Sequence, residues 1–250
     1  MRPAPRVHTE ARLGRGSYSF DKEQARYLGS VLRLKAGDEV RLFNARDGEW
    51  VYRVASMEKR AGEAEPVERR REGEEPSGPV LLFAPIKRTQ TELLAQKATE
   101  LGVRKLVPVV TARTNRDQLR IDRLELIATE AAEQCERLTI PQIEQPRALA
   151  DVLEGVGSFL FCDEAGDQQG EPWGGDEGRA PLGASLIPDV TEVPGAILIG
   201  PEGGFTPEER ESLRADERAV AISLGPRILR AETAAIVALT LWQARFGDLA

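Results

Sequence analysis

The segment PRILRAET brings together polar side chains at the point where the last apolar helix of the chain is expected to begin. These side chains are Arg227, Arg230, Glu232 and Thr233. Arginine and glutamate can take part in proton transfer or stabilise developing charge. Polar residues at a helix N-terminus also serve simply as caps. The segment is a candidate catalytic site, with capping as the alternative.

The same segment follows one of two similar loops. Leu198 to Glu202 reads LIGPE, and Ile222 to Arg227 repeats the strand-glycine-proline arrangement 25 residues later. The first loop, in ILIGPEGGFTPEER, lacks the spacing of a phosphate loop or a dinucleotide fingerprint. Thr206, Pro207 and Glu209 indicate a helix that starts with a capping box. An ordinary turn that uses glycine for positive φ is the alternative interpretation.

Parallel strands place such loops side by side at one edge of a sheet, where α/β folds bind ligands. The end of SFLFC, at Cys162, Asp163 and Glu164, adds a third strand end. We expect a pocket that offers backbone groups and apolar side chains with little cationic charge. Such a lining suits a flat purine with a neutral or zwitterionic tail better than a triphosphate. The apolar side chains expected in this pocket are Ile199, Leu224, Ile228 and Leu229.

From residue 80 onwards the chain alternates strands with helices, which indicates an α/β fold with a parallel sheet. The expected strands are VLLFAPI, VRKLVPVV, SFLFC, AILIG and AVAISLG. The expected helices are TELLAQKATELG, residues 122 to 137, and residues 231 to 246. Residues 165 to 195 are rich in Gly, Pro, Asp and Glu, and we expect a lid or a disordered insertion there.

The N-terminal part has short segments typical of a small β-barrel. GDEVRLFNARDGEWVYRVASM alternates around an Asp47-Gly48 turn and predicts a hairpin with Val40, Leu42 and Val51 or Tyr52 facing inward. Residues 58 to 79 contain almost no large apolar side chain, which predicts a linker or a mobile hairpin tip.

Composition excludes several classes of protein. The net charge is −7, but residues 1 to 57 carry 11 Arg or Lys against 7 Asp or Glu, a balance of +4 that leaves −11 for the rest. A basic module beside an acidic one is compatible with RNA docking, although solvated surfaces also produce such imbalances. One histidine, His8, and two distant cysteines disfavour a hydrolase triad, a disulfide framework and a metal site. No apolar run is long enough for a membrane span or a signal peptide, and we expect a cytoplasmic protein.

Five segments taken together resemble a known family. They are VLRLKAGDEVRLF, QKATELGV, AAEQCER, ILIGPEGGFTPEE and LGPRILRAETAAIVAL, followed by RFGDL at the end of the chain. The chain is similar to the bacterial 16S ribosomal RNA uridine N3-methyltransferases, the RsmE type of the SPOUT superfamily. The resemblance covers nearly the whole chain in the family's order. Tyr27 in place of an expected histidine and Thr111 to Thr114 in place of an acidic residue before an arginine depart from the pattern.

The resemblance implies an α/β fold with a PUA-like β-barrel RNA-binding domain over residues 1 to 72 and a trefoil-knotted methyltransferase domain over residues 73 to 250. It implies a homodimer that uses S-adenosylmethionine to methylate uridine 1498, in the usual numbering, of 16S rRNA in the small ribosomal subunit. The cofactor-binding residues that it implies are Cys162, Leu198, Ile199, Gly200, Pro201, Glu202, Gly203, Gly204, Ser223, Leu224, Gly225, Ile228, Leu229, Arg230 and Thr233.

The implied chemistry assigns roles to polar residues. Arg230 would stabilise the uracil oxygens, and Glu232 would orient that arginine, act as base or cap its helix. Arg113 and Gln134 would reach the site, either within their own chain or from the partner of the dimer. The alternative for both residues is an internal hydrogen bond. For RNA phosphates the candidates are Arg6, Arg33, Lys35 and Arg46, with a solvated surface role as the alternative for each.

Two other functions stay open at this level. One is a knotted RNA methyltransferase with a different target, such as a ribose 2′-hydroxyl. The other is a non-catalytic RNA-binding factor in ribosome assembly. The modified nucleotide separates the first from the expected reaction, and S-adenosylmethionine binding separates the second.

Overall fold

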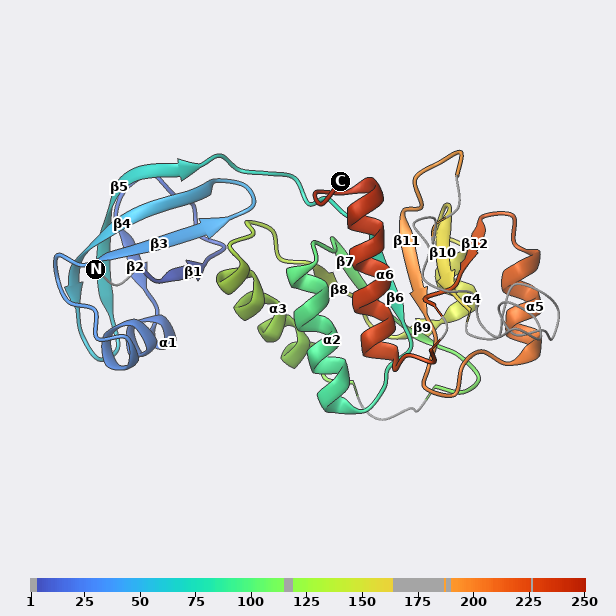
Figure 1. Ribbon diagram of the computed structural model, residues 1–250. Helices are drawn as coiled ribbons and strands as arrows, with labels where there is room; N and C mark the ends of the chain where they lie inside the picture. The colour runs from blue at the N-terminus through green and yellow to red at the C-terminus, as the bar shows by residue number, and fades with distance from the viewer. Residues whose placement is uncertain (1–3, 115–118, 164–186, 188–189, 226) are drawn as a thin grey trace. The chain divides into compact units, whose positions relative to one another are not determined.

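The computed structural model describes residues 4–114, 119–163, 187, 190–225 and 227–250. The chain forms two compact units, each described by itself (Figure 1). The N-terminal unit comprises Met1–Pro76 together with Ala132–Ile140, and the C-terminal unit comprises Ser77–Ala131 together with Pro141–Ala250. The sequence boundary after residue 72 stays a prediction.

The N-terminal unit is built on one mixed sheet. Its strands are β1 (Arg6–His8), β2 (Tyr18–Phe20), β3 (Glu39–Asn44), β4 (Gly48–Met57) and β5 (Gly62–Arg71), in the order β1-β3-β4-β5-β2. Among the described strand pairs of this sheet, β1 and β3 run parallel and the others run antiparallel. Between β2 and β3 lie helix α1 (Lys22–Ala25) and a π-helical turn, η1 (Arg26–Val31). The result is a PUA-like half-barrel.

The β3–β4 hairpin has the turn and inner face that its alternation predicts. Asn44 pairs with Gly48, whose φ of 80° is a conformation that glycine adopts without steric cost. Val40, Leu42 and Tyr52 are fully buried, and Val51 is buried as well. Val40, Leu42 and Tyr52 belong to the core of the half-barrel, whereas Val51, the neighbour of Tyr52 on the strand, does not. The hairpin therefore supplies much of the apolar interior.

Strand β5 contradicts the expectation of a linker over residues 58 to 79. Gly62–Arg71 is a ten-residue strand that pairs with β4 on one side and with β2 on the other. Only its first part meets the core, where Gly62 and Ala64 are buried, and the rest carries exposed charged residues. Backbone pairing with β4, rather than apolar side chains, therefore holds most of this strand in the sheet.

The C-terminal unit has a parallel sheet, as the alternation of segments predicts. Its strands are β6 (Val80–Phe83), β7 (Lys105–Val110), β8 (Gln142–Ile143), β9 (Arg147–Ala148), β10 (Phe159–Cys162), β11 (Ala196–Ile199) and β12 (Ala219–Ile222). The order is β12-β10-β11-β6-β7-β8, and β9 also pairs with β7. All described pairs are parallel. The carboxyl ends of β10, β11 and β12 therefore lie together at one edge.

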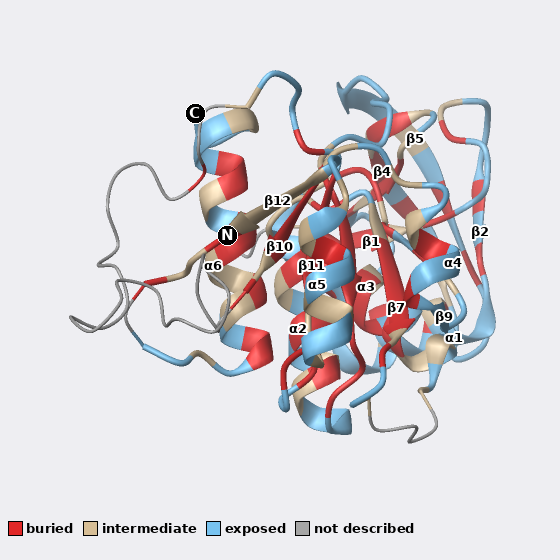
Figure 2. Cartoon of the chain, turned by 90° about the vertical axis from the view of Figure 1, so that its right-hand side faces the viewer, coloured by how far each residue is buried: buried red, intermediate tan, exposed pale blue. Residues whose placement is uncertain are grey.

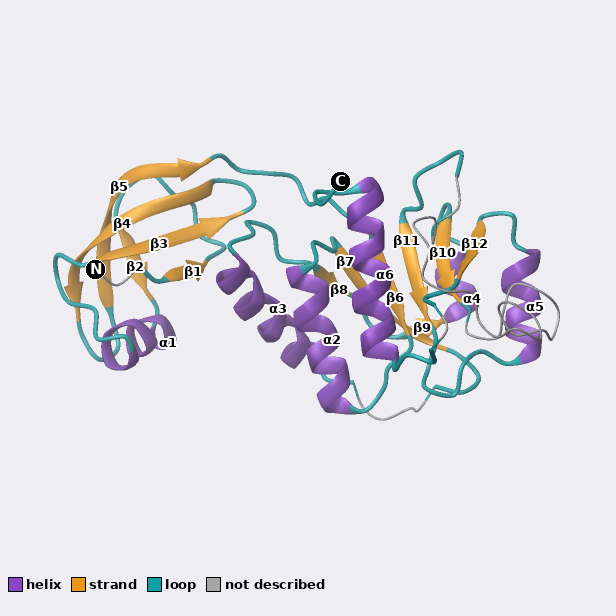
Figure 3. Ribbon diagram, in the orientation of Figure 1, coloured by secondary structure: helices purple, strands orange, loops and turns teal. Residues whose placement is uncertain are grey.

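The helices of the C-terminal unit are α2 (Arg88–Glu100), α3 (Ile121–Cys135), α4 (Leu149–Leu153), α5 (Pro207–Ala215) and α6 (Ala231–Phe246). Residues 132 to 135, the end of α3, are grouped with the N-terminal unit. Helices α2 and α6 lie side by side (Figure 3). The central strands β10 and β11 are almost entirely buried (Figure 2), and so is β6, which explains their continuous apolar sequences.

The prediction of a lid or a disordered insertion over residues 165 to 195 concerns a segment that lies almost wholly outside the described residues. The trefoil knot stays a prediction. Among the described residues, no helix is both long enough and apolar enough to cross a membrane.

Candidate functional site

A cavity of about 380 Å³ lies at the carboxyl ends of the central strands and is called here the strand-end cavity. The loop after β11 and the segment between β12 and α6 form most of its wall. The lining residues are Lys87, Gln90, Cys162, Asp163, Ile199, Gly200, Pro201, Glu202, Gly204, Phe205, Arg210, Ile222, Ser223, Leu224, Gly225, Arg227, Ile228, Leu229, Arg230, Ala231 and Ala234. The two glycine-proline loops therefore meet at one cavity.

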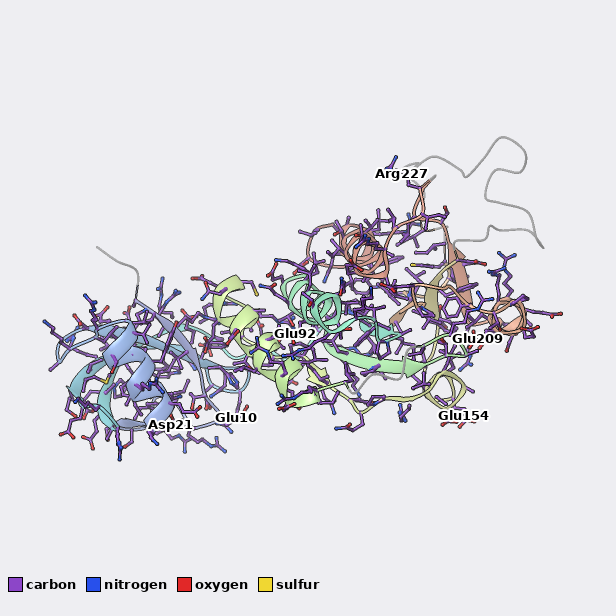
Figure 4. The ribbon with its side chains drawn as sticks, turned by 90° about the horizontal axis from the view of Figure 1, so that it is seen from below. Glu10, Asp21, Glu92, Glu154, Glu209 and Arg227 are labelled. Atoms are coloured by element: carbon purple, nitrogen blue, oxygen red, sulfur yellow. The ribbon has the colours of Figure 1, made fainter. Side chains whose placement is uncertain are left out.

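The first loop is held by the start of α5. Thr206 caps the helix through a 3.2 Å bond to the Glu209 amide, and the Glu209 carboxylate accepts from the Thr206 amide at 2.9 Å. This is the capping box that the sequence indicates. Glu209 also accepts from the Ala112 amide at 2.7 Å, which ties the end of β7 to α5. Figure 4 shows Glu209 at the start of this helix.

The glycines of the loops are explained by the fold itself. A Cβ at Gly200 would lie 3.0 Å from the Phe205 ring, so the absence of a side chain lets that ring pack on the loop. Gly204 has a φ of 66° and Gly225 a φ of 96°, which other residues adopt only with strain. Positive φ is thus required at these two positions, as the turn interpretation proposed.

The second loop is more exposed than the first. The Ser223 hydroxyl accepts from the Gly225 amide at 3.2 Å, which stabilises the turn after β12. Ile228 is 71% exposed, although it lines the cavity. Arg227 projects outward from the chain that leads to α6 (Figure 4). An apolar side chain left in the open at a cavity is typical of a ligand-binding surface.

A buried ion cluster forms part of the cavity wall. The Asp163 carboxylate accepts from Arg214 at 3.0 and 2.6 Å, and Arg210 Nε lies 3.2 Å from it. Both arginines come from α5, so the cluster fixes that helix to the end of β10. Arg210 Nε forms no aligned hydrogen bond with a described residue, so its contact with Asp163 is electrostatic.

Next to this cluster, burial raises the pKa of the Cys162 thiol to about 12, with the Asp163 charge as a smaller cause. The thiol is therefore protonated and uncharged at neutral pH. A neutral thiol is a poor nucleophile. Cys162 thus contributes a small apolar surface to the cavity rather than a reactive group.

The cavity carries more positive charge than the sequence predicted. Lys87, Arg227 and Arg230 form no ion pair with any described residue, while Arg210 is occupied by Asp163. Lys87 was not foreseen because it lies at the start of α2, and the loop between β6 and α2 carries no glycine signal. The expectation of little cationic charge is therefore wrong, and anionic groups of a ligand or substrate are favoured here.

Among the fifteen residues expected to bind a cofactor, three do not line the cavity. Leu198 is a buried strand residue, and Thr233 is exposed on the first turn of α6. Gly203 is the third residue that does not line the cavity, and its carbonyl accepts a hydrogen bond from Arg113. The other residues of that set line the cavity: Cys162, Ile199, Gly200, Pro201, Glu202, Gly204, Ser223, Leu224, Gly225, Ile228, Leu229 and Arg230.

The four expected catalytic residues are not all brought together. Arg230 lines the cavity, and Glu232 follows on the first turn of α6 with 8% exposure and a carboxylate oxygen that has no hydrogen-bond partner among described residues. Arg113 donates to the Gly203 carbonyl at 2.6 Å and thereby holds the first loop. Gln134 lies in the N-terminal unit, exposed on α3, and lines a different cavity with Tyr27 and Arg41.

Sequence reasoning missed several lining residues: Lys87, Gln90, Phe205, Arg210, Ile222, Ala231 and Ala234. The pairing of β11 with β6 brings the chain after β6 to the cavity. Strand order is not encoded in local spacing, so Lys87 and Gln90 gave no signal. Asp163, which the sequence places at the end of SFLFC, does line the cavity, as expected for the third strand end.

The structure does not support Arg6 as an RNA contact. The Arg6 residue is 6% exposed, and its guanidinium donates to Glu49 at 2.6 Å and stacks on the Phe43 ring at 3.4 Å. Arg46 is partly engaged, with a 2.8 Å bond to Asp47. The other two candidates, Arg33 and Lys35, are exposed and form no ion pair with a described residue.

No cluster of three or more His, Cys, Asp or Glu side chains able to hold a metal ion occurs within the described ranges.

Family models match both parts of the chain. An RNA methyltransferase domain matches residues 74–243, and an RNA methyltransferase PUA domain matches residues 20–67. Ribosomal RNA small subunit methyltransferase E from Rickettsia conorii is 34% identical over 94% of this chain and 93% of its own. The Bacillus subtilis protein of the same name is 30% identical over 90% of this chain and 88% of its own.

Solved structures agree with these matches. A ribosomal RNA small subunit methyltransferase E from Neisseria gonorrhoeae, bound to S-adenosyl methionine, is similar with a TM-score of 0.82 at 26% identity, covering 99% of this chain and 100% of that one. A Legionella pneumophila methyltransferase in complex with the same cofactor has a TM-score of 0.76 at 28% identity, covering 97% and 98%. The chain belongs to the ribosomal RNA small subunit methyltransferase E family of RNA methyltransferases.

Proposed function

We propose that this protein transfers a methyl group from S-adenosylmethionine to N3 of a uridine in 16S rRNA of the small ribosomal subunit. Family membership supports the substrate class, and two solved relatives contain the cofactor. The observation that carries the proposal is the strand-end cavity, where both glycine-proline loops and Arg230 meet.

The residues present fit S-adenosylmethionine. The volume of about 380 Å³ lies within the range of small-molecule sites. Ile199, Leu224 and Leu229 offer apolar surface for an adenosine, and the neutral thiol of Cys162 adds no charge to that wall. At another point of the wall, Gln90 Oε1 is buried without a donor among the described residues, so a polar ligand group is needed there.

The bound cofactor would supply an electrophilic methyl group on its sulfonium. N3 of uridine keeps its proton at neutral pH, so the protein must remove that proton or stabilise the anion. Arg230, at the N-cap of α6, is proposed to hold the uracil oxygens as negative charge spreads onto them. Glu232 is proposed to orient Arg230 or to accept the proton, because one of its buried carboxylate oxygens has no described partner.

A homodimer is part of the proposal. Helix α6 is apolar on most of its sides, and Ile236, Val237 and Leu241 are left partly exposed in the single chain. Burial of such a face against a second copy is the usual way to remove apolar surface from water. Gln134 is proposed to reach the partner's site, whereas Arg113 positions the first loop within its own chain.

The N-terminal unit is proposed to hold RNA through Arg33 and Lys35, which are exposed cations without a described ion pair. Phosphate contacts of this kind position the substrate and carry no sequence information. N3 lies on the pairing edge of the base, so the uridine must be unpaired or flipped out of its stack.

The test uses small subunits that lack the modification, incubated with purified protein and cofactor carrying a labelled methyl group. Digestion and mass spectrometry are expected to find the label on N3 of one uridine. Label on another nucleotide or on a ribose would identify a different RNA methyltransferase. Binding of RNA without S-adenosylmethionine binding or methyl transfer would favour an assembly factor.

The variant Arg230→Met tests the role of that side chain. Loss of one preorganised donor is expected to lower kcat by about 10²- to 10³-fold. Arg218→Met is the matched control, because Arg218 is paired with Asp216 and does not line the cavity. An Arg230→Met enzyme with unchanged kcat would remove Arg230 from the mechanism.

A further inference from the structure

Helices α2 and α6 are parallel neighbours that both begin at the strand-end cavity. At their carboxyl ends, Gln243 of α6 donates to the Leu101 carbonyl after α2 at 2.7 Å. At their amino ends, Lys87 and Gln90 of one and Arg230 of the other line the same cavity. The partial positive charge of two helix N-termini is therefore directed at one ligand space.

The amino ends of these two helices also lack side-chain caps. The residues at the cap positions are Lys87 for α2 and Arg230 for α6, and neither forms a side-chain cap bond. In contrast, α5 has a complete capping box through Thr206 and Glu209. The first amides of α2 and α6 are thus available to a ligand oxygen, whereas those of α5 are not.

The side chains at the start of α2 can bind two kinds of ligand group, an anion and a hydrogen-bond donor. Lys87 is a cation with no described ion pair, and it can bind an anion. Gln90 Oε1 is buried with no described donor, and it can accept a hydrogen bond. The two residues are three positions apart at the start of one helix, so their side chains can reach neighbouring groups of one ligand.

We propose that the first turn of α2 binds the amino-acid end of S-adenosylmethionine. Lys87 and the first amides of α2 hold the carboxylate, and Gln90 Oε1 accepts from the ammonium group. A phosphodiester supplies an anion but no donor for Gln90, so it satisfies only half of this subsite. The inference rests on the proposed function and adds the residues that select the zwitterionic tail.

Calorimetry with two adenosine thioethers tests the subsite without any turnover. S-adenosylhomocysteine carries the amino-acid end, and 5′-methylthioadenosine lacks it. Lys87→Gln is expected to weaken S-adenosylhomocysteine binding about tenfold or more, the factor for loss of one charge-assisted hydrogen bond, and to change 5′-methylthioadenosine binding by less than about twofold. Gln90→Met is expected to show the same selectivity, and Gln90→Glu to retain binding of the ammonium group.

Arg88→Gln is the matched control, because Arg88 is the next residue along, is paired with Glu92 and does not line the cavity. It is expected to change neither affinity. Normal 5′-methylthioadenosine binding also shows that a variant is folded.

The proposal is overturned if Lys87→Gln weakens both thioethers equally, or weakens neither. It is equally overturned if this variant loses RNA affinity while S-adenosylhomocysteine binding is unchanged, because Lys87 would then contact phosphate. If the unmodified protein binds neither thioether, the proposed function itself fails, and this result differs from all the variant results above.

Discussion

The buried guanidinium of Arg6 allows a sharp prediction for the variant Arg6→Met. The substitution removes the 2.6 Å pair with Glu49 and the donors to the carbonyls of Ala132 and Arg137, at 2.6 and 2.7 Å. Breaking one side of a buried ion pair costs about 3–5 kcal/mol. Arg41 stays 3.3 Å from the second Glu49 oxygen, so we expect a loss near the lower limit, about 3 kcal/mol.

The free energy of unfolding is measured by urea denaturation, and hydrogen exchange of peptides from β3 and β4 locates the loss in the N-terminal unit. Adding Glu49→Leu to Arg6→Met is expected to recover part of the stability, because two apolar residues leave no unpaired buried charge. The reasoning would be contradicted if the double variant lost more free energy of unfolding than the two single variants lose when their losses are added.

RNA binding separates this structural role from the phosphate contact that the sequence suggested. Lys35→Gln is expected to reduce the dependence of log affinity on log salt by about 0.7–0.9, the value for one phosphate contact. Arg6→Met is expected to leave that slope unchanged, because the Arg6 side chain is only 2% exposed. A smaller slope for folded Arg6→Met would refute the structural assignment.

Three further predictions concern single residues. Gly200→Ala is expected to destabilise the C-terminal unit by about 1–3 kcal/mol in urea unfolding, because the new Cβ would lie 3.0 Å from Phe205, and Phe205→Leu should relieve part of the loss. Burial lowers the pKa of His8, so the folded state binds fewer protons than the unfolded state. Stability is therefore expected to fall as pH drops through 6.5, the ordinary pKa of histidine, and thermal melts of His8→Asn should show a weaker decline. At pH 8 the exposed Cys135 is expected to react with iodoacetamide, while Cys162, which is partly exposed but whose pKa is raised to about 12, stays unmodified in peptide mass maps; rapid modification of Cys162 would contradict its raised pKa.

Local signals explain which elements could be predicted. The start of α5 needed only Thr206, Pro207 and Glu209, because a capping box is made within one turn. Strand β5 could not be predicted in this way, since its segment EAEPVERRR carries almost no apolar alternation. Its place depends on the partner strands β4 and β2, which local sequence does not reveal.

The same distinction holds for the site. Both glycine-proline loops were identified from strand-to-helix spacing, and they do line one cavity. Lys87 and Gln90 were not identified, because they reach the cavity only through the pairing of β6 with β11. Of the cations that line the cavity, Lys87 is the one that this pairing brings there. Arg6 was misassigned because a net basic composition does not tell an exposed arginine from a buried one.

A chemist who designs inhibitors against this pocket would first have to consider Asp163. Its carboxylate is already neutralised by Arg210 and Arg214, so an amine aimed at it would have to compete with two guanidinium groups. An acidic substituent on a nucleoside would instead find Lys87, which is unengaged among the described residues. Carboxylated or sulfonated adenosine analogues are accordingly better starting compounds than aminated ones.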